Sequence, residues 1–373
     1  MKISSLNIFS RELEKYLFIK FTKYFIFFIS LSLLIVFLVE FVELLRRTSE
    51  HPDITSIFYV FYLALLKITE SIIFIIPISI FVTTMITCRY FNKYREMIII
   101  QNAGIHSFRI LYPFIVFTML LCVIYFIFLN PFFSHATNSY QKIDHEVFRG
   151  KLSKTSISKS GIWLRQGSEN NKIVIRASNF LPKKKLFKNA TFYIFTKKNN
   201  FIERIDTENA QLEKDFWILK NVIINKPNKK VIKIDEYTLK TNLSIKKIEN
   251  SFLDPQSLSI WKIPEFIELL KESGFSATKH RLYFYKTIFL PLYLIGLILI
   301  AGSFTIKFTK TKAKKYFFIL TGAVTGFLIH VISETIYSLG IANKLPMWVA
   351  SLSPSIITIM IGGYFVIHFE KTS

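Results

Sequence analysis

Long apolar runs at both ends of this 373-residue chain, separated by one polar block, constrain its fold more than any other feature. The hydrocarbon core of a bilayer is about 30 Å thick, so a helix needs about 20 apolar residues to cross it. Six runs approach or reach that length: residues 24–45, 72–88, 110–129, 284–304, 316–337 and 347–367. The pattern predicts an α+β membrane protein with six transmembrane helices, three on each side of an inserted domain.

The polar block sets the expected domain boundaries. We expect residues 1–130 to hold transmembrane helices one to three, with a short cytoplasmic helix near residues 93–104. Residues 131–277 would form an extracytoplasmic domain with flanking helical linkers, and residues 278–373 would hold helices four to six. No small-residue cleavage site follows the first apolar run, so we expect that run to be retained as a membrane span.

Within the polar block, short β-branched and aromatic stretches alternate with polar turns, at residues 162–164, 173–175, 191–195, 216–219 and 231–234. Short strands at regular spacing are typical of an antiparallel sandwich or jelly roll. A helical pattern returns at residues 264–272. The block is therefore predicted to be an antiparallel β jelly roll followed by a helical linker.

Charge predicts the orientation. The chain carries a formal net charge of +23, and Lys and Arg recur in the N-terminal segment, in the loop after the second run and in the loop after the fourth. Short cytoplasmic loops retain basic residues. Both termini are therefore expected in the cytoplasm and the large domain outside it. The basic residues form no compact motif, and no nucleic-acid-binding pattern is present, so a nucleic-acid partner is not expected.

Hydrolytic and metal chemistry are not expected from this sequence. It contains no G-x-x-x-x-G-K-[ST] phosphate-binding loop, so any ATP hydrolysis would fall to a partner. His135 and His145 lie near acidic residues but lack the ligand spacing of a zinc site. We therefore expect a non-catalytic chain with no cofactor.

Charges within the apolar runs have two interpretations. Lys67 and Glu70 share one helix face, as do His330 and Glu334. Charges at membrane depth pair with one another or line a cavity. For Lys67, mutual neutralisation with Glu70 and a role in a lipid cavity both stay open. For His330 and Glu334, a structural hydrogen bond is favoured over proton transport.

Small residues and prolines predict features of helix packing. Gly322 and Gly326 permit close helix approach. From the residues alone, that approach predicts packing within the chain. Pro77, Pro291 and Pro354 are candidate kinks.

Two polar segments at helix ends also have alternative interpretations. Residues 95–104 (REMIIIQNAG) could form an amphipathic helix with Arg95 and Glu96 toward water and the apolar residues Met97, Ile98 and Ile99 toward a partner, or simply a solvated linker. Arg46 and Arg47 end the first run at its outer face. Guanidinium groups match phosphate oxygens, so these two could bind lipid phosphates; snorkelling to the interface explains them equally well.

Three stretches in this order resemble the LptF/LptG family of lipopolysaccharide export permeases: residues 40–47 (EFVELLRR), residues 95–104, and a region from 258–261 (LSIW) through 274–277 (GFSA) and 280–282 (HRL) to Pro291. A fourth, at 339–340 (LG), 345–346 (LP) and 353–354 (SP), is more similar to the LptG branch. The six-span layout and the β insert match too, so the resemblance covers essentially the whole chain.

The resemblance implies a permease subunit of an ABC transporter that extracts lipopolysaccharide from the inner membrane and passes it to a periplasmic bridge. The implied partners are a related LptF-like permease, a cytoplasmic LptB-like ATPase dimer, and LptC- and LptA-like single-span and bridge proteins. It assigns ATPase coupling to Arg95, Glu96, Met97, Ile98, Gln101 and Gly104. It assigns lipid contact to Arg46, Arg47, Glu40, Phe41 and Lys67, and gate packing to Gly322 and Gly326.

Two other functions fit the layout alone. A membrane-anchored periplasmic sensor or assembly scaffold would explain the domain order but not the segment at 95–104. A secondary transporter would predict inverted repeats, and the two halves show no convincing similarity. We therefore favour the permease.

Overall fold

The computed structural model describes residues 2–49, 56–148, 162–167, 171–181, 186–196, 200–213, 216–227, 230–241, 253–272, 276–306 and 312–371. The chain divides into two compact units. The helical unit comprises Met1–Thr137 and Arg281–Ser373, and the sheet unit comprises Asn138–His280.

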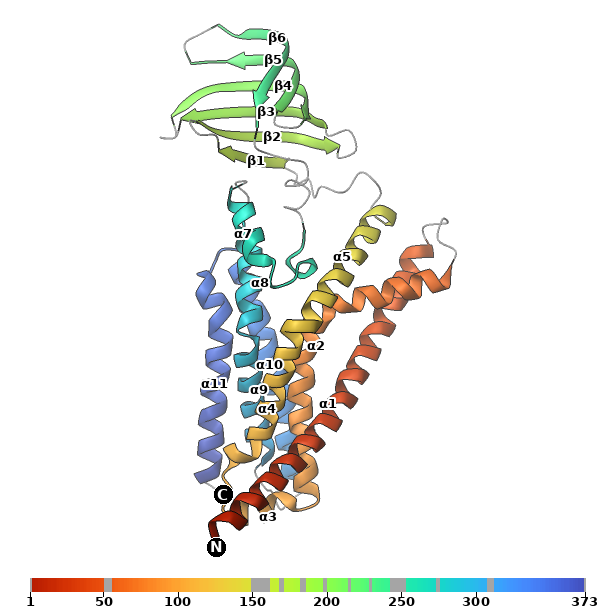
Figure 1. Ribbon diagram of the computed structural model, residues 1–373, viewed down its shortest axis with the longest axis vertical. Coiled ribbons are helices and arrows are strands. Elements are labelled where there is room, and N and C mark those ends of the chain that lie inside the picture. Colours follow the sequence, from red (N-terminus) through yellow and green to blue (C-terminus); the bar gives the residue numbers. More distant parts are fainter. Residues whose placement is uncertain are drawn as a thin grey trace. The chain divides into compact units, whose positions relative to one another are not determined.

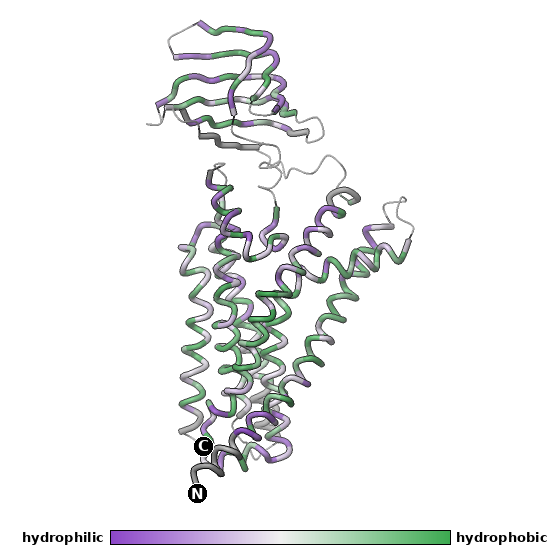
Figure 2. Tube along the Cα trace, in the orientation of Figure 1, coloured by the Kyte–Doolittle hydropathy of each residue, from purple (hydrophilic) through white to green (hydrophobic). Residues whose placement is uncertain are grey.

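The helical unit is a bundle of long helices, with both chain ends and α3 at the same end of it (Figure 1). The elements that contribute to it are α1 (Lys2–Ser49), α2 (Ile57–Lys93), α3 (Glu96–Asn102), α4 (Ser107–Ile124), the π-helical turn η1 (Tyr125–Leu129), α5 (Asn130–Val147), α8 (Thr278–Ile288), α9 (Leu290–Ile306), α10 (Lys312–Ile341) and α11 (Met347–Lys371). Hydrophobic residues fill the middle of the long helices, and hydrophilic residues gather toward their ends (Figure 2).

Five helices of the described chain are long and apolar enough to cross a bilayer, and a sixth candidate is the bent pair α8–α9. That pair turns by 51°. Pro291 follows the break and explains the bend, because its ring removes one backbone donor and displaces the preceding turn. Pro77 and Pro354 lie inside the continuous helices α2 and α11. The count of six spans therefore depends on taking the bent pair as one.

Aromatic packing joins the first half of α1 to α4. The rings of Phe21 and Phe114 stack with centroids 4.4 Å apart, and Phe117 packs edge-on against Phe21 and Phe25. These rings belong to one apolar core that also takes residues from α2, α3, α9 and α11. The helices share this core unequally: in the apolar stretch of α2, 72% of residues are buried, against 6% in those of α1 and α10.

The sheet unit contains one antiparallel sheet whose six described strands pair in sequence order. The strands are β1 (Ile162–Gly167), β2 (Asn171–Leu181), β3 (Leu186–Thr196), β4 (Phe201–Leu212), β5 (Phe216–Asn225) and β6 (Ile232–Lys240). Antiparallel pairing is thus confirmed. The jelly roll is not confirmed, since sequential pairing among the described strands makes a meander, without the crossovers of a Greek key.

A line of irregular residues crosses the sheet and changes which side chains face inward. On β3 the buried positions Phe192 and Ala190 are two residues apart, but the next buried residue, Phe187, is three residues away. On β5 the buried positions Trp217 and Leu219 are likewise two apart, and the next, Val222, is three away. Asn189 and Asn221 have positive φ angles of 48° and 54° at these points. The strand register is the same on both sides of the line. The sheet therefore bends there without slipping, and its apolar face encloses Trp217.

An amphipathic helix, α7 (Ile263–Glu272), completes the sheet unit and confirms the helix predicted at 264–272. Its apolar residues Ile263 and Leu270 are buried, while Glu265 and Lys271 are exposed. Nearby, the His280 ring donates from Nε2 to the Leu253 carbonyl at 3.1 Å, and Lys279 pairs with Asp254.

Candidate functional site

The helix α3 carries the predicted ATPase-coupling residues, and it is held in a short turn between α2 and α4. Arg95 enters it with a left-handed φ of 61°. At its end Gly104 has φ 77°, and the backbone N–H groups of Gly104 and Ile105 bond the carbonyls of Gln101 and Ile100. This is the Schellman arrangement, in which glycine is favoured because it has no Cβ.

The side chains of α3 divide between the core and the surface. Met97 and Ile100 are buried in the core of this chain, so Met97 does not lie on the accessible face that the sequence predicted for it. Ile98, Gln101 and Glu96 are half-buried. Arg95 and Ile99 are exposed, and Ile99 has 66% of its surface accessible. The accessible surface of α3 is therefore formed by Arg95, Ile99 and the turn that follows Gln101.

Glu96 accepts one hydrogen bond from the Tyr16 hydroxyl of α1, which is shared between its two carboxylate oxygens at 3.1 and 3.3 Å. Lys20, one helical turn further along α1, donates to the Tyr90 hydroxyl at 3.0 Å, and its ammonium lies 4.5 Å from the centroid of the Tyr90 ring. The sequence analysis did not single out Tyr16, because an aromatic residue near the end of a membrane helix is common at an interface.

At the other end of α1, the predicted lipid residues Arg46 and Arg47 share one carboxylate. Arg46 donates from Nε and Nη2 to Glu43 at 3.0 Å each, and Arg47 donates from Nε at 2.9 Å. The Arg46 side chain is 66% exposed and that of Arg47 is 39% exposed. These two cations are thus presented at the surface together with a neighbouring anion.

Lys67 of α2 forms an ion pair with Glu40 of α1, and both side chains are mostly buried. The sequence analysis had considered Glu70 as the neutralising partner, since pairing within one helix can be read from spacing, whereas pairing between helices cannot. Phe41, the next residue of α1, stacks on Phe37 with centroids 5.7 Å apart and meets the edge of Phe61 of α2. The predicted lipid residues Glu40, Phe41 and Lys67 therefore lie together where α1 meets α2.

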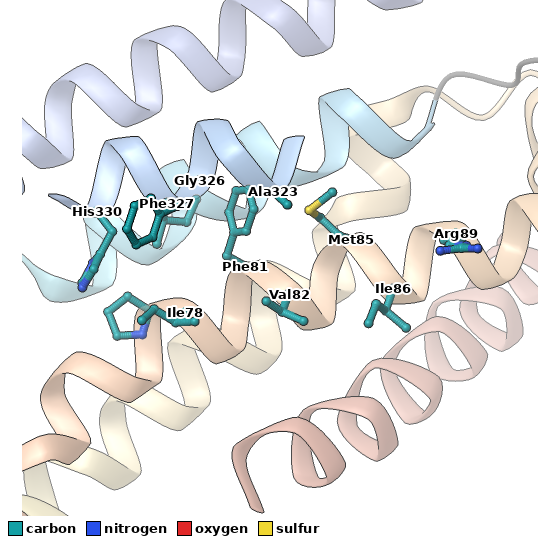
Figure 3. A pocket seen from close by; sticks show the side chains of 12 residues that line it. Ile78, Phe81, Val82, Met85, Ile86, Arg89, Ala323, Gly326, Phe327 and His330 are labelled. Carbon is teal, nitrogen blue, oxygen red and sulfur yellow. The ribbon is translucent and has the colours of Figure 1, made fainter. Parts of the chain in front are cut away.

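An apolar pocket of about 300 Å³ lies between α2 and α10, with Leu297 of α9 also in its wall (Figure 3). Phe81, Met85 and Ile86 of α2 lie opposite Phe327 of α10, and Arg89 and His330 lie at opposite ends of the lining. The sequence analysis did not identify this pocket, because hydropathy marks both helices as apolar and does not say which faces leave a space.

Gly322 and Gly326 face into this chain. A Cβ atom on Gly326 would lie 2.3 Å from the Phe81 ring, and one on Gly322 would lie 2.8 Å from the Met85 side chain. Both glycines thus let α10 approach α2 closely, which is the packing alternative considered for them. Their predicted part in a moving gate stays a prediction.

A polar cluster lies beside the apolar pocket. Lys286 of α8 donates to both carboxylate oxygens of Glu334 on α10, at 2.7 and 2.9 Å, and its ammonium lies 4.3 Å from the centroid of the Tyr337 ring. His330 Nδ1 is buried and has no hydrogen-bond partner within the described part of the chain. Glu334 is thus paired with Lys286, and the hydrogen bond between Glu334 and His330 Nδ1 favoured from spacing does not form among the described residues.

The chain has apolar helices around a pocket, and in sequence its β-sheet unit is inserted between two groups of helices. These features define a multi-span α+β membrane protein. Across the described residues, no group of three His, Cys, Asp or Glu side chains could hold a metal ion. Comparison with known families specifies the class. Residues 15–368 match the family described as lipopolysaccharide export system permease LptF/LptG, and the chain belongs to that family.

Individual relatives carry the LptG name. The chain is 24% identical over 315 residues to the lipopolysaccharide export system permease protein LptG of Haemophilus influenzae, covering 79% of this chain and 82% of that protein. It is 30% identical over 118 residues to LptG of Escherichia coli K12, covering 32% of each. The predicted resemblance is confirmed, and the chain is a transport component rather than an enzyme.

Proposed function

We propose that this chain is the permease subunit of an ABC transporter that extracts lipopolysaccharide from the inner membrane and passes it to a periplasmic bridge. The observation that carries this proposal is the family match, which spans the helices at both ends and the sheet between them. The relatives' name specifies export of lipopolysaccharide. In this arrangement both termini and α3 are cytoplasmic, and the sheet unit is periplasmic.

In the proposed function, α3 is the cytoplasmic part of this chain that would contact an ATPase dimer. Met97 and Ile100 anchor α3 in the core, so a push on its exposed residues Arg95 and Ile99 acts on the bundle. The family resemblance implies that Glu96 pairs with a basic residue of the ATPase. The Glu96 carboxylate has two oxygens with about four acceptor sites, so it can bind a guanidinium while it accepts from Tyr16.

The lipid site of the proposal combines the pocket with the basic residues at the far end of α1. An apolar pocket of about 300 Å³ suits part of an acyl chain, because its lining carries few polar groups. Lipid phosphates would replace Glu43 as the partner of Arg46 and Arg47, and would replace Glu40 as the partner of Lys67. For each cation the exchange replaces one anion by another, so no cation is left unpaired in the membrane.

The related permease subunit would lie against α1 and α10. Both helices have apolar faces that this chain does not cover: Phe27 and Val39 of α1 are 59% and 63% exposed, and Leu320 and Phe327 of α10 are 65% and 67% exposed. α10 also forms one wall of the pocket. A second subunit placed there would close the lipid site from the side.

The sheet unit would join the periplasmic bridge through one edge of its sheet. β6 is the last strand of the described sheet and pairs with β5, and strand addition beside β6 would be the mode of binding. The single-span and bridge proteins would bind in this way. The folded apolar face is filled by Trp217 and Phe192, so acyl chains would pass over it only if the sheet opens.

Site-specific photocrosslinking tests the lipid site. A photoreactive phenylalanine at Phe327, in the pocket, should crosslink lipopolysaccharide in membranes, and the yield should fall when ATP drives extraction. The matched control is Tyr364 on α11, which is 63% exposed but outside the pocket lining. Equal yields at both positions, unchanged by ATP, would refute the assignment.

A charge reversal tests the contact with the ATPase. Glu96→Lys should abolish co-purification of the ATPase, because it places a cation against the partner's basic residue. Glu12→Lys on α1 makes the same change at an exposed position and should leave the ATPase bound. Normal ATPase recovery and transport with Glu96→Lys would exclude α3 as the coupling helix, and would favour the sensor or scaffold alternative.

A further inference from the structure

The cytoplasmic segment of α1 contacts the chain before, within and after α3. Lys20 donates to Tyr90 near the end of α2, Tyr16 donates to Glu96 in α3, and Glu14 pairs with Arg109 at the start of α4 at 3.5 Å. α3 lies beside this end of α1 in Figure 1. Three polar contacts from one short segment of α1 therefore reach α3 and the helices on either side of it.

The Tyr16 contact differs from the other two because it reaches α3 itself. Its O···O distances of 3.1 and 3.3 Å exceed the usual 2.7–2.8 Å of an O–H···O bond, so the hydroxyl is shared weakly between the two carboxylate oxygens. The Tyr16 ring packs against Phe91 with centroids 6.0 Å apart, which fixes the position from which the hydroxyl donates. Such a bond can guide the carboxylate without blocking a stronger cationic donor.

The same helix reaches the other end of the bundle. α1 is continuous from Lys2 to Ser49, and a helix rises about 1.5 Å per residue, so Tyr16 and Glu40 are separated by about 36 Å along its axis. Glu40 pairs with Lys67 there, and Arg46 and Arg47 follow. A displacement of α1 at Tyr16 is therefore carried to the proposed lipid residues without an intervening loop.

We propose that Tyr16 is a positioning residue that holds the Glu96 carboxylate from the α1 side, so that α1 and α3 move together when the ATPase acts on α3. The inference rests on the proposed function. It adds that α1 carries the movement of α3 to the lipid site, and that the Tyr16 hydroxyl is the link between the two helices.

The test replaces only the hydroxyl. Tyr16→Phe keeps the ring against Phe91 and removes the donor to Glu96. Tyr24→Phe is the matched control: Tyr24 lies on the same helix, its ring is 5.9 Å from that of Tyr90, and no contact of its hydroxyl supports the proposal. Each variant is purified with its partner subunits and reconstituted in vesicles that contain lipopolysaccharide.

Tyr16→Phe should retain the ATPase and hydrolyse ATP, but the amount of lipopolysaccharide extracted per ATP should fall about three- to tenfold, the range expected for one hydrogen bond. Tyr24→Phe should match the wild type. A role in folding alone would instead lower the melting temperature and leave the ratio unchanged. Spin labels at the exposed positions Ile19 of α1 and Asn102 of α3 should report a broader α1–α3 distance distribution in Tyr16→Phe.

The possible outcomes distinguish a failure of the proposed function from a failure of the role proposed for Tyr16. If the wild-type chain recruits no ATPase, the proposed function fails. If the wild type transports lipopolysaccharide and Tyr16→Phe extracts as much per ATP as Tyr24→Phe, the proposed function stands and the role of Tyr16 is refuted.

Discussion

α2 and α1 are neighbouring apolar helices with opposite surroundings. In the apolar stretch of α2, 72% of the residues are buried by this chain, whereas in α1, as in α10, the figure is 6%. In water such exposure would be costly, but lipid tails are as apolar as leucine, so it costs little in a membrane. α2 therefore supports the bundle from within, whereas α1 and α10 have faces that are available to lipid or to another subunit.

Alanine substitutions of two phenylalanines in α1 test this contrast, and one of them should have the largest effect on stability. Phe21→Ala removes a fully buried ring stacked on Phe114, and should destabilise the helical unit by on the order of 2 kcal/mol. This is less than in a water-soluble core, because lipid is the reference environment. Phe27→Ala, at a position 59% exposed, should leave thermal unfolding in detergent nearly unchanged. It should instead reduce recovery of the related permease. The reverse ranking in thermal unfolding would contradict the division of α1 into two faces.

Alanine substitutions at three glycines should show where two helices pack too closely to accept a Cβ atom. A Cβ on Gly296 of α9 would lie 2.6 Å from Thr358 Cβ and 2.8 Å from the Ile359 backbone nitrogen, which cannot move easily. Gly296→Ala should thus cost about 1–3 kcal/mol. For Gly326→Ala, the three atoms nearest the new Cβ all belong to the Phe81 ring, which can rotate toward the pocket, so this variant should reduce lipid crosslinking at Phe327 more than stability. Gly363→Ala has open space and serves as the control. Equal melting temperatures for Gly296→Ala and Gly363→Ala would refute this ranking.

The shared carboxylate at the end of α1 gives a smaller effect. Glu43→Gln removes the anion that accepts from Arg46 and Arg47, so lipopolysaccharide should bind about one and a half- to fivefold more tightly, the range of an exposed ion pair. Binding to the purified permease, measured at low and high salt, checks this, since the gain should shrink as salt screens the charges. Glu12→Gln is the control, and weaker binding by Glu43→Gln would argue for snorkelling arginines without a lipid ligand.

The helical part of the fold was largely predictable from sequence, because bilayer thickness acts on each segment separately. The runs at 24–45, 72–88 and 110–129 lie within α1, α2 and the continuous segment from α4 to α5. Five of the six described strands contain a stretch that the sequence pattern singled out, whereas β4 (Phe201–Leu212) was not predicted. The bend of the sheet at Asn189 and Asn221 was not predictable, since it depends on residues in different strands that align only after pairing.

The candidate site was predictable in its residues and less so in their partners. Glu96 was selected through the family resemblance, Arg46 because guanidinium groups match phosphate oxygens, and Lys67 because charges at membrane depth are costly. Their contacts with Tyr16, Glu43 and Glu40 could not all be inferred: the Glu43 contact follows from i,i+3 and i,i+4 spacing, but the other two join different helices. The pocket depends on the faces of α2 and α10 in the same way.

The sequence by itself determined that the chain is a membrane protein with an inserted β-rich domain, and its motif order determined the LptF/LptG family. Local chemistry is sufficient for those conclusions, because hydrophobic length and strand alternation are properties of single segments. Only the tertiary structure decided that α2 is buried while α1 and α10 are exposed, that Lys67 pairs with Glu40, and that Tyr16 reaches Glu96. Those facts depend on distances between segments far apart in the chain, which hydropathy and spacing do not encode.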